Sequence, residues 1–512
     1  MPLQNLTISQ LLRRTAAQHP QRPALEHEGL VLSYRELDEQ ADRYAQSLLD
    51  LGVKKGDHVA ILCEAEPNAV IAAYALTRIG AVAVMLNTSL LREELEIRLR
   101  SADVKTLLIG DVYKDLHYPT LCQGMHERIL YIGRKADATY PPLSAAGEAG
   151  PAVHTAEALV SPQDPAFILF TSGTGSAPKA VVSSHFSRAN SGIQQAKDLA
   201  ATCEDRFCVA MPIFHCFCLS VNVMAACAVG ACLYLPRSRR TAALLDAISE
   251  GKCTVFSCVP ALYRAILKKA DLSRYDLSSL RTGFIGGSTY PEELFEEVER
   301  RLGFTLLSSL GQTEATAGIT TSYLHDPIEV RRSTVGHFMD HVEGRIADAE
   351  TGAALPAGQA GEICVRGYVV MQGYYAQPEE TAKVIDKDGW LHTGDVGWMD
   401  ENGNIHLEGR LKELIIRGGE NISPKEIETV FFDDPQVKQC KAVGVPDEHY
   451  GEEICLCVCG NCTESELREK LARKLAAYKM PKYIRFYDEL PATATGKIKL
   501  QELKAMAARD VQ

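Results

Sequence analysis

Short apolar runs that alternate with helix-like segments are the feature that most restricts the fold of this chain. Residues 57–87 predict an apolar strand, a helix that opens near Pro67 and closes at Gly80, and a second apolar strand. The same order recurs where AFILF (166–170) precedes a glycine-containing loop, CTVFSC (253–258) precedes PALYRAIL, and LRTGFIGG (280–287) precedes PEELFEEVERR. Strands that are apolar on both faces and alternate with helices indicate an α/β fold with largely parallel, helix-covered sheets.

The length of 512 residues favours a large domain followed by a small one. After Met371, turn dipeptides and alternating residues predict a β-rich, antiparallel subdomain. Beyond Arg410 the chain restarts as a compact α+β unit that includes a helix opened by a Thr463–Glu466 capping box. We therefore expect a large domain over residues 1–409 and a small C-terminal domain over 410–512, with the boundary in GRLKE (409–413).

Composition excludes several classes of function. The formal charge is −12, with 54 Lys and Arg against 66 Asp and Glu, so nothing predicts a nucleic-acid partner. The first residues lack the apolar core of a secretory signal, and a cytoplasmic location is expected. Residues 216–235 are uncharged and approach the ~20 residues of a membrane span. However, Ser220, Asn222 and the lack of a second such segment in the chain favour a buried core helix that runs into a strand.

The 16 cysteines raise the question of a metal site. Cys455, Cys457 and Cys459 are closely spaced, as are Cys216 and Cys218, and their alternation would place each set on one face of a strand. Structural zinc sites use two C-x-x-C-like pairs or a Cys/His mixture at loop spacing, which neither set has. Small buried apolar side chains are the favoured interpretation.

The stretch LFTSGTGSAPKAVVSSH (169–185) has the hydroxyls and glycines of a phosphate-binding loop. A Walker loop needs a lysine that follows glycine and precedes Ser or Thr, whereas Lys179 lies between Pro178 and Ala180. The dinucleotide pattern G-x-G-x-x-G also fails. The backbone and hydroxyls of this loop are nevertheless suited to a polyphosphate.

Five segments resemble, in family order, the motifs of the adenylate-forming superfamily of acyl-CoA synthetases, adenylation domains and luciferases. Besides the loop, these are SLGQTE (309–314), GWLHTGD (389–395), GRLKELIIRGGENISPKEIE (409–428) and LPATATGKIKL (490–500). The resemblance covers nearly the whole chain and is nearest to the medium-chain fatty acyl or aryl-CoA ligase branch. It implies ATP and Mg²⁺ as cofactors and coenzyme A as co-substrate.

The resemblance also assigns roles to particular residues. Lys497 is implied to bridge the α-phosphate and the substrate carboxylate, Glu314 to bind Mg²⁺, and His215 in MPIFHCFCL to lie beside that carboxylate as a catalytic group. Lys412 is the implied hinge, while Gly418 and Gly419 would form the thioester (CoA) segment. The implied nucleotide-binding residues are Thr171, Ser172, Gly173, Thr174, Gly175, Lys179, Gly286, Gly287, Ser288, Gln312, Thr313, Asp395 and Arg410. The implied acyl-pocket residues are Asn222, Leu310, Gly311, Ala317 and Gly318.

The expected reaction joins a small carboxylic acid to coenzyme A through an acyl-adenylate and releases AMP and pyrophosphate. No aspartate follows His215 to pair with a substrate ammonium, so a non-amino acid, fatty or aryl, is favoured. Two alternatives stay open: loading of a separate carrier protein, and a degenerate adenylate-binding sensor. The sensor is suggested by departures from the family loop, where Gly175 and Ser176 replace Thr-Gly and Ala180 replaces glycine. The sequence indicates neither the acid's identity nor the oligomeric state.

Overall fold

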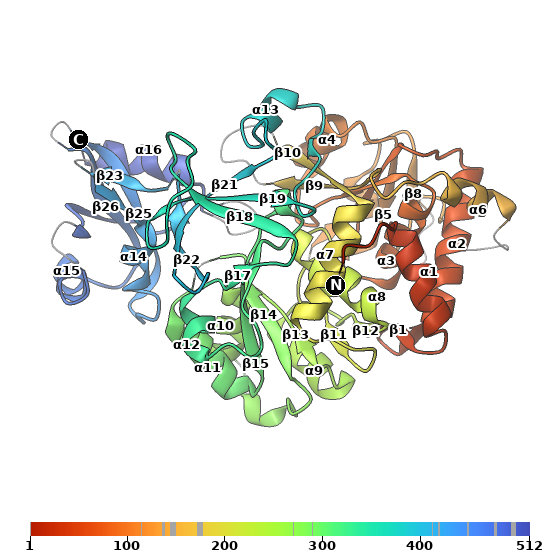
Figure 1. Cartoon of the computed structure of the whole chain (residues 1–512), viewed down its shortest axis with the longest axis horizontal. Coiled ribbons are helices and arrows are strands. Elements are labelled where there is room, and N and C mark those ends of the chain that lie inside the picture. Colours follow the sequence, from red (N-terminus) through yellow and green to blue (C-terminus); the bar gives the residue numbers. More distant parts are fainter. Residues whose placement is uncertain are drawn as a thin grey trace.

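The structure is a computed structural model, shown in Figure 1. It describes residues 2–113, 115–135, 139–143, 150–171, 178–269, 271–288, 290–411, 413–417, 420–447, 450–475, 479–492 and 498–511. The N-terminal helices lie at one end of the elongated molecule and the C-terminal unit lies at the other (Figure 1). The sheet that contains β18, β19, β21 and β22 lies between the C-terminal unit and the two larger sheets.

Two large sheets form most of the first 340 residues. The first has nine strands, in the order β17 (His337–Phe338), β16 (Thr320–Thr321), β15 (Thr305–Leu310), β14 (Thr282–Gly286), β13 (Val255–Phe256), β11 (Arg206–Cys208), β12 (Cys232–Tyr234), β1 (Pro23–His27) and β2 (Leu30–Ser33). The second has seven, in the order β20 (Gly373–Tyr374), β10 (Lys179–Ser184), β9 (Pro165–Thr171), β4 (Val82–Met85), β3 (His58–Leu62), β5 (Thr106–Ile109) and β8 (Ile129–Tyr131). Most neighbouring pairs are parallel, as predicted, and antiparallel pairs occur at the edges.

Helices cover both large sheets. They are α1 (Ile8–Gln18), α2 (Tyr34–Asp50), α3 (Pro67–Arg78), α4 (Arg92–Ser101), α5 (Tyr118–Leu121), α6 (Pro151–Ala158), α7 (His185–Asp198), α8 (Ala225–Val229), α9 (Thr241–Gly251), α10 (Pro260–Lys269), α11 (Glu292–Leu302) and α12 (Ile328–Ser333). A short pair, β6 (Val112–Tyr113) and β7 (Leu116–His117), and a 3₁₀ turn, η2 (Leu272–Arg274), complete this region.

The predicted βαβ unit is confirmed as β3, α3 and β4, with β3 parallel to β4. Val59 and Ile61 of β3 belong to the core shared by the two large sheets. Ala60 and Leu62, which point the other way, belong to the separate core on the outer face. Burial of both faces explains why these strands read as unbroken apolar runs.

The uncharged stretch 216–235 lies mostly in the core shared by the two large sheets. It forms a π-helical segment, η1 (Cys218–Met224), continues into α8 and, after Gly230, enters β12. The prediction of a core helix that runs into a strand is therefore confirmed, but Cys216 and Cys218 lie in a helix and their placement on a strand was wrong. Gly192 of α7 permits the close approach, because a Cβ there would lie 2.3 Å from Met224 Cβ. None of the helices among the described residues is both long and apolar enough to cross a bilayer.

The β-rich region predicted after Met371 begins earlier, at Val342. Its antiparallel sheet has the order β18 (Val342–Ala347), β19 (Gly361–Gly367), β21 (Leu391–Met399) and β22 (Ile405–Arg410). A short helix, α13 (Pro378–Ala382), precedes β21. Arg345 of β18 and Arg366 of β19 lie over the Trp390 ring, at 4.2 Å and 4.8 Å from its centroid. These contacts join β18 and β19 to the residue that precedes β21.

The C-terminal unit has a sheet of its own, formed by β24 (Glu420–Ile422), β23 (Ile415–Arg417), β26 (Gly451–Gly460), β25 (Val437–Asp447) and β27 (Tyr483–Phe486). Its helices are α14 (Pro424–Thr429), α15 (Glu464–Ala472) and α16 (Leu500–Asp510), and α15 has the predicted capping box. Cys455, Cys457 and Cys459 are buried on one face of β26 in the core that includes α16. All 16 cysteines are free thiols and 13 of them are buried, including the five closely spaced ones that were predicted to be small core residues.

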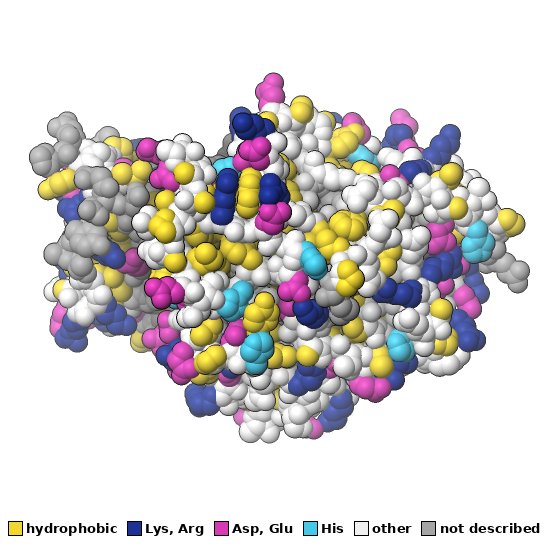
Figure 2. Space-filling model, viewed as in Figure 1, with side chains coloured by type: hydrophobic (Ala, Val, Ile, Leu, Met, Phe, Trp, Pro, Cys, Tyr) yellow, Lys and Arg dark blue, Asp and Glu magenta, His cyan; other side chains and the backbone are white. Residues whose placement is uncertain are grey.

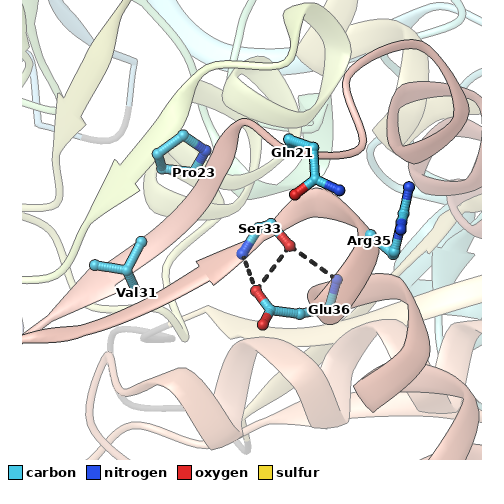
Figure 3. A pocket seen from close by; sticks show the side chains of 6 residues that line it. All are labelled: Gln21, Pro23, Val31, Ser33, Arg35 and Glu36. Atoms are coloured by element: carbon cyan, nitrogen blue, oxygen red, sulfur yellow. Dashed lines mark hydrogen bonds between the residues drawn. The ribbon is translucent and has the colours of Figure 1, made fainter.

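Acidic and basic side chains are interspersed on the face shown in Figure 2. A surface pocket of about 410 Å³ lies beside the edge strand β2. Figure 3 shows that Ser33 and Glu36 bond to each other there, as the capping box of α2. Four strands of the same sheet, β1, β12, β11 and β13, lie between β2 and β14, so this pocket is remote from the carboxyl ends of β14 and β15.

Candidate nucleotide and acyl site

The carboxyl ends of two adjacent parallel strands bring the first predicted site residues together. Gly286, the last residue of β14, pairs with Ser309 of β15. A Cβ on Gly286 would lie 2.7 Å from the Ser309 carbonyl oxygen, so only glycine fits there. Gly287 has a φ of +84°, and Gly287 and Ser288 are exposed. Strand ends of this kind are where open α/β sheets bind ligands.

The loop after β15 carries Gln312, Thr313 and Glu314 in a tight turn, η3 (Thr313–Ala315). Thr316 and Ala317 both have positive φ, 54° and 90°, a conformation that non-glycine residues rarely adopt. Hydrogen bonds hold the strained turn, because Ser191 and Ser220 both donate to the Thr316 carbonyl oxygen. The turn is thus fixed to α7 and η1 by its neighbours.

The predicted acyl-pocket residues gather around this turn. Gly311 cannot carry a side chain, because its Cβ would lie 1.6 Å from the Ala317 carbonyl oxygen. A Cβ on Gly318 would meet Gln195 Nε2 at 2.4 Å. Leu310 and Ala317 are buried, and Asn222 of η1 is fully buried with no amide partner among the described residues.

Glu314 is linked to the phosphate-loop lysine through one tyrosine. The Tyr374 hydroxyl donates a hydrogen bond of 2.9 Å to Glu314 Oε1. Lys179 Nζ lies 4.8 Å from the centroid of the Tyr374 ring and forms a 2.7 Å ion pair with Glu380 of α13. Thr171 and Lys179 are cross-strand partners in the antiparallel pair β9–β10. The loop between them thus joins two hydrogen-bonded strands and not a strand and a helix.

Asp395 and Arg410 form the predicted pair across β21 and β22. They are register partners, and Arg410 Nε lies 2.9 Å from Asp395 Oδ1. Asp395 is 4% exposed, and its second oxygen, Oδ2, is buried without a hydrogen-bond partner in the described part of the chain. Burial raises the pKa of Asp395 to about 6; Arg410 opposes the rise and Glu314 adds to it. The two carboxylates are thus close enough for the charge of Glu314 to act on Asp395.

His215 is exposed to solvent although protein atoms crowd around its ring. The Phe217 N–H donates to His215 Nδ1 at 3.2 Å, so the neutral ring carries its proton on Nε2. Burial lowers the pKa of His215, but the adjacent Cys216 thiol outweighs it and the net pKa is raised. In either protonation state, Nε2 is therefore a donor.

Cys216 connects this histidine to the Glu314 turn. The Thr313 hydroxyl donates to Cys216 Sγ at 3.7 Å. Burial opposes ionisation of the thiol, yet His215, Arg188 and Thr313 lower the pKa of Cys216 below its usual value. Through Thr313 and Glu314, the structure joins the histidine, the carboxylate and the phosphate-loop lysine in one set of contacts.

Several predicted residues lie outside the described part of the chain. They are Ser172, Gly173, Thr174, Gly175, Lys412, Gly418, Gly419 and Lys497. Their predicted roles, and the position of the hinge, stay predictions.

Sequence reasoning missed Tyr374 and Glu380, because no motif spacing distinguishes them within QGYYAQPEE. It also missed a cluster of Glu362, Cys364 and His392, whose ligand-type atoms lie within 4.8 Å of one another. The three residues come from two strands whose register is not readable from sequence.

The chain matches known proteins over nearly its whole length. The model of the AMP-binding enzyme family matches residues 12–375, and that of the AMP-binding enzyme C-terminal domain matches residues 426–497. The medium-chain acyl-CoA ligase ACSF2 of Rattus norvegicus is 32% identical, with 98% of this chain and 88% of that protein covered. The acyl-CoA ligase sidI of Aspergillus fumigatus is also 32% identical, with 98% and 91% covered.

The solved structures with a similar fold include other CoA ligases. The anthranilate CoA ligase AuaEII in complex with anthranoyl-AMP has a TM-score of 0.87 and 25% identity, with 100% of this chain and 99% of that chain covered. The o-succinylbenzoate CoA synthetase MenE of Bacillus subtilis, in complex with its acyl-adenylate, has a TM-score of 0.83 and 26% identity, with 98% and 99% covered.

The chain therefore belongs to the family of AMP-binding enzymes, as the five motifs predicted. Within this adenylate-forming superfamily, its full-length relatives identify it as an acyl-CoA synthetase.

Proposed function

We propose that this enzyme activates a non-amino carboxylic acid, fatty or aryl, with ATP and transfers the acyl group to coenzyme A. The observation that carries the proposal is the convergence of Asp395, Glu314, Lys179 and His215 on one region of the first domain. A carboxylate is a poor electrophile, so its oxygen first attacks the α-phosphate of ATP and pyrophosphate leaves. The thiol sulfur then attacks the acyl carbon, and AMP leaves.

The nucleotide fits the groups that the structure leaves unsatisfied. Asp395 Oδ2 is a buried acceptor that a ribose hydroxyl would satisfy, and Arg410 holds the other oxygen of the carboxylate. Gly286, Gly287 and Ser288 would let the backbone approach the adenine. Lys179 would exchange Glu380 for the β- and γ-phosphates.

Negative charge at the phosphates needs cations. Glu314 is the proposed Mg²⁺ ligand, held by Tyr374, and a bound Mg²⁺ would neutralise charge on the phosphate oxygens. A cation about 4 Å from the developing charge contributes on the order of 4 kcal/mol at an effective dielectric near 20. Lys497 is proposed as the second cation at the α-phosphate, on sequence grounds.

The acid is proposed to place its carboxylate beside His215 Nε2 and its tail near the turn at residues 310–318. His215 then orients the attacking oxygen by hydrogen bonding. The named substrates of the relatives, medium-chain acyl groups and anthranilate, support fatty and aryl acids as the classes to test. Because the rat relative is named as mitochondrial, the expected cytoplasmic location stays a prediction.

The test is product analysis with purified enzyme, ATP, Mg²⁺ and coenzyme A across straight-chain, branched and aromatic acids. The proposal expects equal amounts of AMP and acyl-CoA with a subset of these acids. Formation of acyl-adenylate without any thioester would contradict coenzyme A as the acceptor. A carrier protein would then be the acceptor to test.

A further inference from the structure

The turn that carries Asp395 is a large bulge in β21. Glu362 of β19 pairs with Val396, and Cys364 pairs with His392. Two residues along β19 therefore span the same length as four along β21. Three residues of β21, Thr393, Gly394 and Asp395, thus lie opposite the single residue Ile363 of β19, and Gly394 has a φ of +70°. Bulges of this kind re-aim side chains next to active sites.

The carboxylate of Glu362 supports this bulge from inside. It is 7% exposed, and Oε1 accepts a 2.9 Å hydrogen bond from the Gly394 N–H. Its other oxygen, Oε2, lies 2.7 Å from His392 Nδ1 and accepts the proton of that ring nitrogen. One side chain thus holds both sides of the turn, in place of the ladder bonds that the bulge removes.

A second set of bonds transmits this constraint to Asp395. The Thr393 hydroxyl donates to the Ile363 carbonyl oxygen at 2.6 Å and accepts from the Asp395 N–H at 3.0 Å. Leu411 N–H donates to the Gly394 carbonyl oxygen at 2.8 Å. The backbone of Asp395 is therefore fixed relative to β19 by Thr393, which lies between the two residues that Glu362 contacts.

We propose that Glu362 is a positioning residue, which holds the 393–395 turn so that Asp395 presents Oδ2 to the ribose of the nucleotide. The inference rests on the proposed ribose-binding role of Asp395. Glu362 contacts no reacting atom in this account; it acts through Gly394 and His392.

A cation at this cluster is the competing explanation, because Cys364 Sγ also lies 3.6 Å from His392 Nδ1. Burial raises the pKa of Cys364 to about 12, although the adjacent Arg345 guanidinium acts in the opposite direction. The positive charge of the neighbouring Arg345 disfavours a cation at this cluster. A direct Glu362–His392 hydrogen bond accounts for the geometry without one.

The experiment measures equilibrium binding of AMP and 2′,3′-dideoxy-AMP, which needs no turnover, by calorimetry with the full chain. Wild type is expected to prefer AMP. Glu362→Ala and Glu362→Asp are expected to reduce that preference about tenfold, because neither can make both bonds. Glu362→Gln keeps the acceptor for Gly394 and is expected to recover most of it. The KM for ATP should rise in the Ala and Asp variants while kcat changes less.

Glu343→Ala is the matched control, because Glu343 is an exposed residue on the neighbouring strand β18, paired with Arg366. It should keep the preference of wild type. The inference is overturned if wild type shows no preference, or if folded Glu362→Asp discriminates as wild type does. It is also overturned if EDTA abolishes the preference, which would assign the cluster to a metal. A different result would contradict the proposed function and leave this inference intact. In that case AMP would still bind, but no product would form when an acid is added.

Discussion

The Tyr374 hydroxyl donates to Glu314 Oε1 at 2.9 Å and so fixes the carboxylate proposed to bind Mg²⁺. Tyr374→Phe removes this bond and leaves the ring that faces Lys179. We expect the Mg²⁺ concentration for half-maximal activity to rise about tenfold, since a hydrogen bond to a charged group contributes about 1.5–3 kcal/mol. Tyr375→Phe is the control, because that hydroxyl bonds to the exposed Asp103. An unchanged Mg²⁺ requirement in Tyr374→Phe would contradict the role of Tyr374.

The ion pair of Lys179 with Glu380 competes with the phosphates in the proposed site. Glu380→Gln should release the lysine and lower the KM for ATP about two- to fivefold, the range expected for a partly exposed pair. Glu379→Gln changes the adjacent exposed residue of α13 and should leave the KM unaltered. A higher KM for ATP in Glu380→Gln would show that Glu380 supports nucleotide binding instead.

The raised pKa of Asp395 predicts that kcat/KM for ATP falls on the acid side of its pH profile. Its pKa in the folded free enzyme is raised to about 6 by burial, so the carboxylate that accepts the ribose hydroxyl is lost as the pH falls through about 6. We expect kcat/KM for ATP to fall below that pH. In Asp395→Asn, kcat/KM should be low throughout and this fall at acid pH should be absent. A fall at acid pH that persists in the Asn variant would assign it to another group.

The raised pKa of Asp395 also affects stability, but here the loss is expected at high pH and not at low pH. A carboxyl whose folded pKa lies above its unfolded value of about 3.9 stabilises the fold in its protonated form, and this contribution is lost as the pH rises through about 6. The Asn variant lacks the ionised form and should melt above wild type at pH 8, with the difference shrinking towards pH 4. A difference in melting temperature that does not depend on pH would contradict the shift.

His215 is expected to act on the acid and not on the nucleotide. His215→Ala should lower kcat/KM for the acid about tenfold with little change in the KM for ATP, and His215→Gln should recover part of the loss because its amide can donate. His117→Ala, at an exposed histidine, is the control. Equal effects on acid and ATP would contradict the separation of roles.

The layered fold was predictable because β3 and β4 bury both faces, which leaves a continuous apolar signature between helices. The motif residues Asp395, Arg410 and Glu314 could be identified for a similar reason: each belongs to a local sequence pattern. Tyr374 and Glu362 could not, because their roles depend on which strands become neighbours and on a bulge that shifts the register. The helical placement of Cys216 and Cys218 was missed because two cysteines spaced by one residue fit a strand and a helix equally well.

The central claim is that the region joining Asp395, Glu314 and His215 forms an acyl-adenylate. ATP–pyrophosphate exchange by the wild-type enzyme, measured with and without each acid of a straight-chain, branched and aromatic panel, tests it most directly. The account predicts exchange that requires one class of acid and that does not require coenzyme A. Absence of exchange with every acid, in protein that still binds AMP, would contradict it.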